Sequence, residues 1–215
     1  MSINKKKYYK SIGLTKRRKM KIGLLGGSFN PAHSGHIYIS NEALKRLELD
    51  EIWWLVSPQN PLKSNSISAP LKIRLDNARS MAKGHNIRVE DLETKFKTNF
   101  TSKTLEFIIK RYGGSKFVWL MGADNLVEIN QWFNWKNIFQ IMPVAVFNRD
   151  VYSYSVINSI AGKYYFSKLH KTKDSNSIFD KPLPAWQFLH INKNPISSTL
   201  LRLKKITDRK NIKNG

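Results

Sequence analysis

The segment from residue 21 to residue 47 constrains the fold of this chain more strongly than any other. The apolar run IGLL at residues 22–25 leads into a glycine-rich loop from Gly26 to His36, and a helix-like pattern continues from there to Leu47. A strand, a glycine loop and a helix start in this order direct backbone N–H groups and a helix dipole toward a phosphate group. The segment therefore predicts an α/β unit that handles a phosphorylated ligand.

Apolar runs and helix-like runs alternate along most of the chain. We expect strands at residues 21–25, 51–56, 87–89, 116–121, 143–147 and 188–191. We expect helices at residues 34–47, 71–83, 101–112, 153–160 and 198–206, with Pro70 at the first helical position of the second and Gly113-Gly114 ending the third. This alternation predicts a Rossmann-like α/β fold: a doubly wound, mostly parallel sheet with helices on both faces. Ligands of such sheets bind at the carboxyl ends of the strands.

Length and charge indicate a single domain with basic ends. The chain has 215 residues, enough for one sizeable core. Residues 1–19 are rich in Lys and Arg and contain no acidic residue, so we expect a basic extension, or a true start at Met20. We place the folded domain at residues 20–206 and a basic tail at residues 207–215, and we expect residues 161–185 to be an irregular insertion.

Composition excludes several classes of protein. No apolar run reaches the roughly 18 residues of a membrane span. The chain has no cysteine, which excludes disulfide frameworks and thiolate metal sites. The N-terminus lacks the apolar core of a secretory signal, so we expect a cytoplasmic protein. The net charge of +22 attracts polyanions, but its lysines are scattered, which favours a compositional bias over a nucleic-acid interface.

The residue types in the glycine-rich loop suit phosphate chemistry. Gly26 and Gly27 allow the backbone to approach a ligand closely, and Ser28 supplies a hydroxyl. His33 and His36 are about one helical turn apart, so both imidazoles can face one phosphoryl group and donate to its oxygens. The alternative, a metal-binding histidine pair, needs further ligands that the neighbouring sequence does not offer.

The whole loop resembles the Gly-Gly-Ser-Phe-Asp-Pro-x-His-x-Gly-His signature of the nucleotidyltransferases with the His-x-Gly-His motif. Within that superfamily it is most similar to the bacterial nicotinate-nucleotide adenylyltransferases, over about residues 20–206. The resemblance implies that Phe29 also belongs to the ATP site. Asn30 stands where the family commonly has Asp, which puts in doubt any role that needs a carboxylate there.

A second phosphate motif lies near the C-terminus, in the string ISSTLLR at residues 196–202. Ser197 at a helix N-cap would leave the N–H groups of Ser198 and Thr199 for an anion. Arg202 follows about one turn later and matches phosphate oxygens. Alone, this string is typical of an ordinary capped helix. It resembles the family element that grips the ATP phosphates, which implies that Ile196 also lines the ATP site.

The acceptor side rests on weaker similarities. Lys63 lies in a loop that resembles the family's Pro-x-x-Pro-x-Lys, and it would bind the acceptor phosphate. Thr101 occupies the position that recognises the nicotinate carboxylate, with Lys103 replacing the usual Asp nearby. Trp132 would stack on the nicotinate ring, and Arg149 matches a basic position near the acceptor. The plain alternatives are a solvated lysine, a helix cap and a surface arginine.

Gly122 and Asp124 lie in the string MGADN directly after an apolar run. The string resembles the family's Gly-Ala-Asp, in which the carboxylate accepts from a ribose hydroxyl of ATP. An aspartate after a buried strand is otherwise often a turn or cap residue. Trp135, three residues beyond Trp132, is expected in the core.

Together the motifs predict transfer of the adenylyl group of ATP to nicotinate mononucleotide, with release of pyrophosphate. His33, His36 and Arg202 are the expected catalytic residues. Mg²⁺ would be held by substrate and water, and we expect no metal site built by the protein. The alternatives are an adenylyltransferase for nicotinamide mononucleotide or phosphopantetheine, and, in another class, an RNA-binding module. We expect no membrane partner, and the oligomeric state, including a homo-oligomer, stays open.

Overall fold

Six parallel strands form one sheet in the order β3-β2-β1-β4-β5-β6. The computed structural model describes residues 19–58, 68–148, 156–170 and 174–191. The strands are β1 (Lys21–Gly27), β2 (Glu51–Val56), β3 (Ile87–Glu90), β4 (Lys116–Gly122), β5 (Val144–Asn148) and β6 (Trp186–His190). The predicted Rossmann-like sheet is confirmed, and its strand order is the one typical of doubly wound folds.

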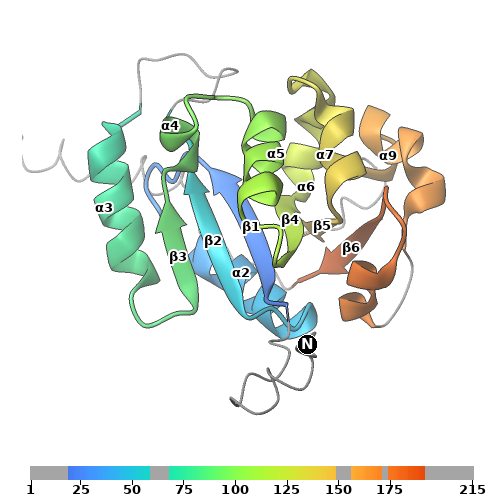
Figure 1. Ribbon diagram of the computed structural model, residues 1–215, viewed down its shortest axis with the longest axis horizontal. Coiled ribbons are helices and arrows are strands. Elements are labelled where there is room, and N and C mark those ends of the chain that lie inside the picture. The colour runs from blue at the N-terminus through green and yellow to red at the C-terminus, as the bar shows by residue number, and fades with distance from the viewer. Residues whose placement is uncertain (1–18, 59–67, 149–155, 171–173, 192–215) are drawn as a thin grey trace, which may run out of the picture.

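Helices cover both faces of this sheet (Figure 1). One face carries α5 (Thr101–Arg111), α6 (Ala123–Glu128), α7 (Trp135–Ile141) and α9 (Ile160–Tyr164), and the other carries α2 (Ser34–Arg46) and α3 (Leu71–Ala82). The strands separate two apolar clusters, one under each helix layer. Because both faces are covered, the strands are nearly continuous apolar runs, which is why they were readable from the sequence.

Several helix boundaries differ from those expected. Pro70 is the N-cap of α3 with extended backbone, one position earlier than predicted. Helix α5 ends at Arg111, before the two glycines, yet neither glycine has the left-handed backbone of a glycine stop; of the described glycines, Gly84 has it. The short helix α4 (Leu92–Lys95) and the helices between β4 and β5 were not predicted. Their short lengths give the 3.6-residue pattern too few turns to be recognised.

The predicted helix at residues 153–160 lies partly outside the described residues. Within them, residues 156–157 are helical, a turn follows, and α9 begins at Ile160 with Ser159 as its N-cap. The predicted helix at residues 198–206 lies wholly outside. The predicted last strand starts two residues earlier than expected, at Trp186, whose buried indole donates to the Tyr165 carbonyl oxygen.

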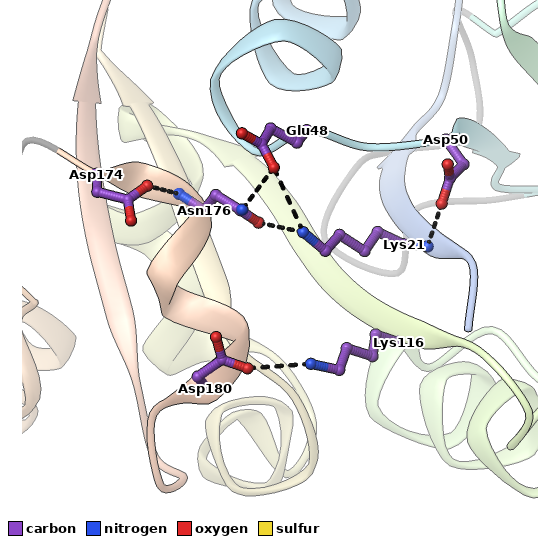
Figure 2. Close-up of polar contacts among 7 residues, drawn as sticks. All are labelled: Lys21, Glu48, Asp50, Lys116, Asp174, Asn176 and Asp180. Atoms are coloured by element: carbon purple, nitrogen blue, oxygen red, sulfur yellow. Dashed lines mark hydrogen bonds and ion pairs between the residues drawn. The ribbon is translucent and has the colours of Figure 1, made fainter. Parts of the chain in front are cut away.

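In the described part of the segment expected to be an irregular insertion, two short helical turns follow α9: η3 (Phe166–Lys168) and η4 (Ser175–Asp180). Two lysines bind the second turn, η4, to the end of the sheet where the parallel strands begin, which we call the amino edge (Figure 2). The opposite end, where the strands finish, is the carboxyl edge. Lys21, the first residue of β1, donates to the Asn176 side chain and lies 3.7 Å from Glu48 Oε2. Lys116, the first residue of β4, pairs with Asp180 at 3.1 Å. We call these contacts the amino-edge clamp.

Candidate active site

The glycine-rich loop lies at the point where the strand order reverses. From β1 the chain continues to β2 on one side, while β4 lies on the other side of β1. Leu25 pairs with Leu120, so the segments that leave β1 at Gly27 and β4 at Gly122 emerge next to each other. This reversal is where doubly wound sheets bind ligands, as expected from the sequence.

The first two glycines of the loop, Gly26 and Gly27, belong to β1, and Gly26 serves packing. A Cβ atom at Gly26 would lie 2.4 Å from Cη2 of Trp119 on β4, closer than any side chain tolerates. A Cβ atom at Gly27 would make only ordinary contact, 3.5 Å from the Phe29 ring. There is therefore space beside Gly27 for a ligand to approach the backbone, as the sequence predicts. At Gly26, contact with Trp119 is sufficient to account for the missing side chain.

The two histidines form a reciprocal cap at the start of α2. His33 is the N-cap, and its Nδ1 accepts from the Gly35 N–H at 3.1 Å, while His36 Nδ1 accepts from the His33 N–H at 3.2 Å. The ring centroids are 3.9 Å apart, and the expectation that both imidazoles face one phosphoryl group stays a prediction. An Nδ1 that accepts carries no proton, so each neutral ring holds its proton on Nε2. The caps thus make Nε2 the hydrogen-bond donor of both histidines.

Buried aromatic rings support this pair from below. Phe29 is 1% exposed, and its ring lies 4.6 Å from that of His36 and stacks on Trp54 at 4.9 Å. The Trp54 indole is fixed in turn by donating to Ser40 Oγ at 2.8 Å. The Phe29 ring therefore packs beneath His36, and its expected place in the ATP site stays a prediction. Trp54 and Ser40 were missed because their residue types are ordinary in a core.

A buried arginine that the sequence analysis missed joins the loops after β1 and β2. Arg74 on α3 is 2% exposed. Its guanidinium donates to the carbonyl oxygens of Ser28 at 2.7 Å, Ser57 at 2.6 Å, Pro58 at 2.7 Å and Ala69 at 2.8 Å. Burial lowers the pKa of Arg74 from its usual value. Its position on a buried face of α3 was the available signal, because an arginine there needs partners.

Polar side chains next to Arg74 make further contacts between the loops after β1 and β2 and their neighbours. Ser57 donates its backbone N–H to the Gly27 carbonyl oxygen at 2.9 Å and its hydroxyl to Glu93 at 2.8 Å. Burial raises the pKa of the Glu93 carboxyl, and the Ser57 hydroxyl opposes that rise.

Asn30, buried in the loop, accepts from the Ala69 N–H at 3.3 Å through Oδ1. An amide oxygen suffices for that bond, so replacement of the family's Asp leaves this contact intact.

Of the predicted acceptor residues, Thr101 lies at the amino end of α5, and Trp132 follows α6 and the short turn η2 in the chain. Thr101 is the first residue of α5 and its N-cap is Phe100, so Thr101 is not the helix cap that was its plain alternative. Trp132 is half-buried after η2 (Ile129–Gln131) and packs on the core beneath it. Lys103 extends over the Phe100 and Phe133 rings, 5.7 and 5.5 Å from their centroids.

Gly122 and Asp124 lie where β4 meets α6, and their role at the ATP ribose stays a prediction. Gly122 ends β4 and is the N-cap of α6, and Asp124 is exposed in the first turn of that helix. The Asp124 carboxylate folds back over Gly122, where a Cβ atom would collide with it. Trp135, expected in the core, is partly buried, with its ring edge-on to Phe139 and Tyr165.

The remaining predicted site residues lie outside the described residues and stay predictions: Lys63, Arg149, Ile196, Ser197, Ser198, Thr199 and Arg202. Within the described part of the chain, no three His, Asp or Glu side chains converge on a metal position. No helix in that part is long and apolar enough to cross a bilayer.

Comparisons with known proteins identify the family of the chain. The family model described as cytidylyltransferase-like matches residues 24–204. A "probable nicotinate-nucleotide adenylyltransferase" of Methylorubrum extorquens is 41% identical over 185 residues, covering 86% of this chain and 100% of the relative. One of the same name from Cereibacter sphaeroides is 43% identical, covering 85% and 96%.

A solved structure supports the fold. The Plasmodium falciparum nicotinic acid mononucleotide adenylyltransferase complexed with NaAD superposes with a TM-score of 0.63. It is 19% identical in sequence, and the match covers 86% of this chain and 83% of that one. At 19% identity, what the two proteins are shown to share is the fold, that is, the arrangement of strands and helices.

Proposed function

This chain belongs to the cytidylyltransferase-like family, and within it to the nicotinate-nucleotide adenylyltransferases, and on that premise we propose that it adenylylates nicotinate mononucleotide. The products are nicotinate adenine dinucleotide and pyrophosphate. Relatives matched over 96% and 100% of their own lengths support an activity of the whole domain. The observation that carries the proposal within the structure is the capped histidine pair at the sheet's reversal point.

The reaction needs positioning more than proton transfer. An oxygen of the acceptor's 5′-phosphate attacks the α-phosphorus of ATP, and the bond from that phosphorus to the bridging oxygen of the β-phosphate breaks. The electron pair leaves with pyrophosphate. Because the nucleophile is already an anion, no general base is required, and neutralising phosphate charge becomes the main task.

His33 and His36 supply two directed donors for that task. Their Nδ1 atoms are occupied by backbone N–H groups, so each Nε2–H is the atom that would donate to phosphate oxygens. Fixed donors need no reorganisation as charge develops, which is how such groups lower a barrier. We expect Arg202 and the N–H groups of residues 198 and 199 to hold the same triphosphate from the other side.

The acceptor residues complete the proposal. Thr101 would meet the nicotinate carboxylate and Trp132 would stack on the ring, a contact that contributes about 1–3 kcal/mol in comparable cases. Lys63 would bind the acceptor phosphate, Arg149 would supply a basic group near the acceptor, and Asp124 would accept from the ribose of ATP. Mg²⁺ would enter with ATP and take its ligands from phosphate oxygens and water, as its chemistry favours.

The direct test is an assay of the purified protein with ATP, Mg²⁺ and nicotinate mononucleotide. We expect pyrophosphate release together with formation of the dinucleotide. Nicotinamide mononucleotide and phosphopantetheine, assayed in parallel, decide among the alternative acceptors by their values of kcat/KM. Absence of pyrophosphate with the nicotinate compound, from a protein that is folded by circular dichroism, would refute the proposal.

A further inference from the structure

We propose that Arg74 is a positioning residue. It holds the backbone that supports the His33 and His36 side chains, and it does not contact the substrate. This inference rests on the proposed function for its activity readout. It concerns a side chain that belongs to neither phosphate motif. Arg74 lies on α3, a helix to which no part of the reaction has been assigned.

The first argument is the number and origin of its partners. A guanidinium has five N–H donors in a rigid fork. Four of the Arg74 donors go to backbone carbonyl oxygens, and these come from the loop after β1, the loop after β2 and the residue before Pro70. One side chain therefore fixes three chain segments relative to each other.

The second argument concerns charge. Within the described residues no carboxylate forms an ion pair with Arg74, although the side chain is almost completely buried. Removing an ion from water is costly, and an apolar side chain of similar volume often fills such a place with greater stability. Four carbonyl dipoles offset part of that cost. An apolar side chain could not bring several carbonyl oxygens to fixed places, whereas the donors of the guanidinium do.

The third argument is the path from Arg74 to the histidines. The carbonyl of Ser28 belongs to the peptide that precedes Phe29, and Phe29 has a left-handed backbone with φ of 45°. Non-glycine residues adopt that conformation only where their surroundings enforce it. The bond to Ser28 holds this peptide plane, and Phe29 then places its ring 4.6 Å from that of His36. Loss of the guanidinium would release the peptide and tilt the support of the imidazole.

Ala69 supplies an independent link in the same direction. Its carbonyl oxygen accepts from Arg74 Nε at 2.8 Å, and its N–H donates to Asn30 Oδ1 at 3.3 Å. Asn30 follows Phe29 directly, so both sides of the left-handed residue are tied to the residues around Arg74. The loop is thereby held at Ser28 and at Asn30, which brackets the strained position.

The test compares Arg74→Lys and Arg74→Met with Arg79→Met, which replaces an exposed arginine of the same helix whose ion pair within the described residues is with Asp76. We expect kcat to fall at least about tenfold in both Arg74 variants, measured well below their melting temperatures and normalised to folded protein. Lysine keeps the charge but not the fork, so it should restore stability more than rate. Arg79→Met should match wild type in kcat.

A second set of measurements does not depend on turnover. It can therefore be used if an Arg74 variant folds poorly, or if the wild-type protein acts on an acceptor other than nicotinate mononucleotide. The nitrogen-15 resonances of His33 and His36 report the Nε2–H tautomer, and calorimetry with a non-hydrolysable ATP analogue reports the triphosphate site. In Arg74→Lys we expect altered imidazole resonances and at least about fivefold weaker analogue binding. Unchanged resonances and affinity, or a kcat within twofold of wild type in folded Arg74→Met, would overturn the inference. If wild type binds the analogue but ignores nicotinate mononucleotide, the proposed function fails and this one stands.

Discussion

The two ends of the strands use ionisable residues in opposite ways. At the carboxyl edge Arg74, His33 and Glu93 are 2%, 6% and 7% exposed, and most of their bonds go to backbone or to neutral groups. At the amino edge the clamp pairs Lys116 with Asp180, which are 40% and 76% exposed (Figure 2). Buried, backbone-paired groups hold one geometry, whereas exposed ion pairs tolerate many. The difference separates a rigid site from an adjustable fastening.

The largest effect is expected from His36→Ala. Removing one directed donor to a developing phosphate charge lowers kcat about 10²–10³-fold. The variant also loses half of the reciprocal cap, so its melting temperature should fall modestly while the fold persists. Steady-state kinetics with circular dichroism checks this. Near-normal turnover would show that the carboxyl edge is as tolerant as the amino edge.

Next in size is Trp54→Phe, which removes the donor to the buried Ser40 hydroxyl. An unsatisfied buried group costs about 1–3 kcal/mol, measured by urea unfolding. The matched control is Trp53→Phe on the opposite face of the same strand, whose indole donates to Glu51 at 2.6 Å. Both variants should lose stability, but only Trp54→Phe should lower kcat, because Trp54 alone supports Phe29. Equal effects on kcat would contradict the proposed support.

A smaller effect with a clear sign is expected from Glu93→Gln. Burial raises the pKa of Glu93 above its ordinary value of 4.5, so the folded protein binds this proton more tightly than the unfolded chain does. Its contribution to the unfolding free energy is therefore largest below pH 4.5 and declines as pH rises through the folded-state pKa. The amide has no such proton and can still accept from Ser57.

Chemical denaturation at a series of pH values from about 4 to about 7 measures this difference. We expect Glu93→Gln to gain stability relative to wild type as pH increases across that range. If the unfolding free energies of wild type and Glu93→Gln changed in parallel with pH, the Glu93 carboxyl would be as well solvated as the exposed carboxyl groups of Glu48 and Asp180.

The smallest effect belongs to the amino-edge clamp. Lys116→Met should change the unfolding free energy by about 0.2–1 kcal/mol, less at high salt, because exposed ion pairs contribute little. Turnover should equal that of wild type. A large loss of activity would mean that the two edges are coupled through β4, and the contrast between them would be too simple.

The same contrast explains what the sequence predicted well. The strands and the glycine-rich loop were legible because buried parallel strands are continuous apolar runs and the loop combines rare residue types. Arg74 and Trp54 were not, since each acts through partners such as Ser28 and Ser40 that lie 46 and 14 residues away in the chain. The turn at residues 175–180 escaped as well, because its fastening to Lys21 spans 155 residues. Contacts of this range leave no local period.

The packing of Trp119 against Gly26 bears on how substitution data for such enzymes should be interpreted. Any side chain at position 26 must displace an indole inside the sheet before a nucleotide is involved. Intolerance to substitution there, in a mutational scan or across a collection of homologues, therefore reports a steric limit between two strands. Position 27, one residue later, has room for a Cβ atom, so intolerance at that position is the informative measure of how closely a nucleotide approaches the backbone.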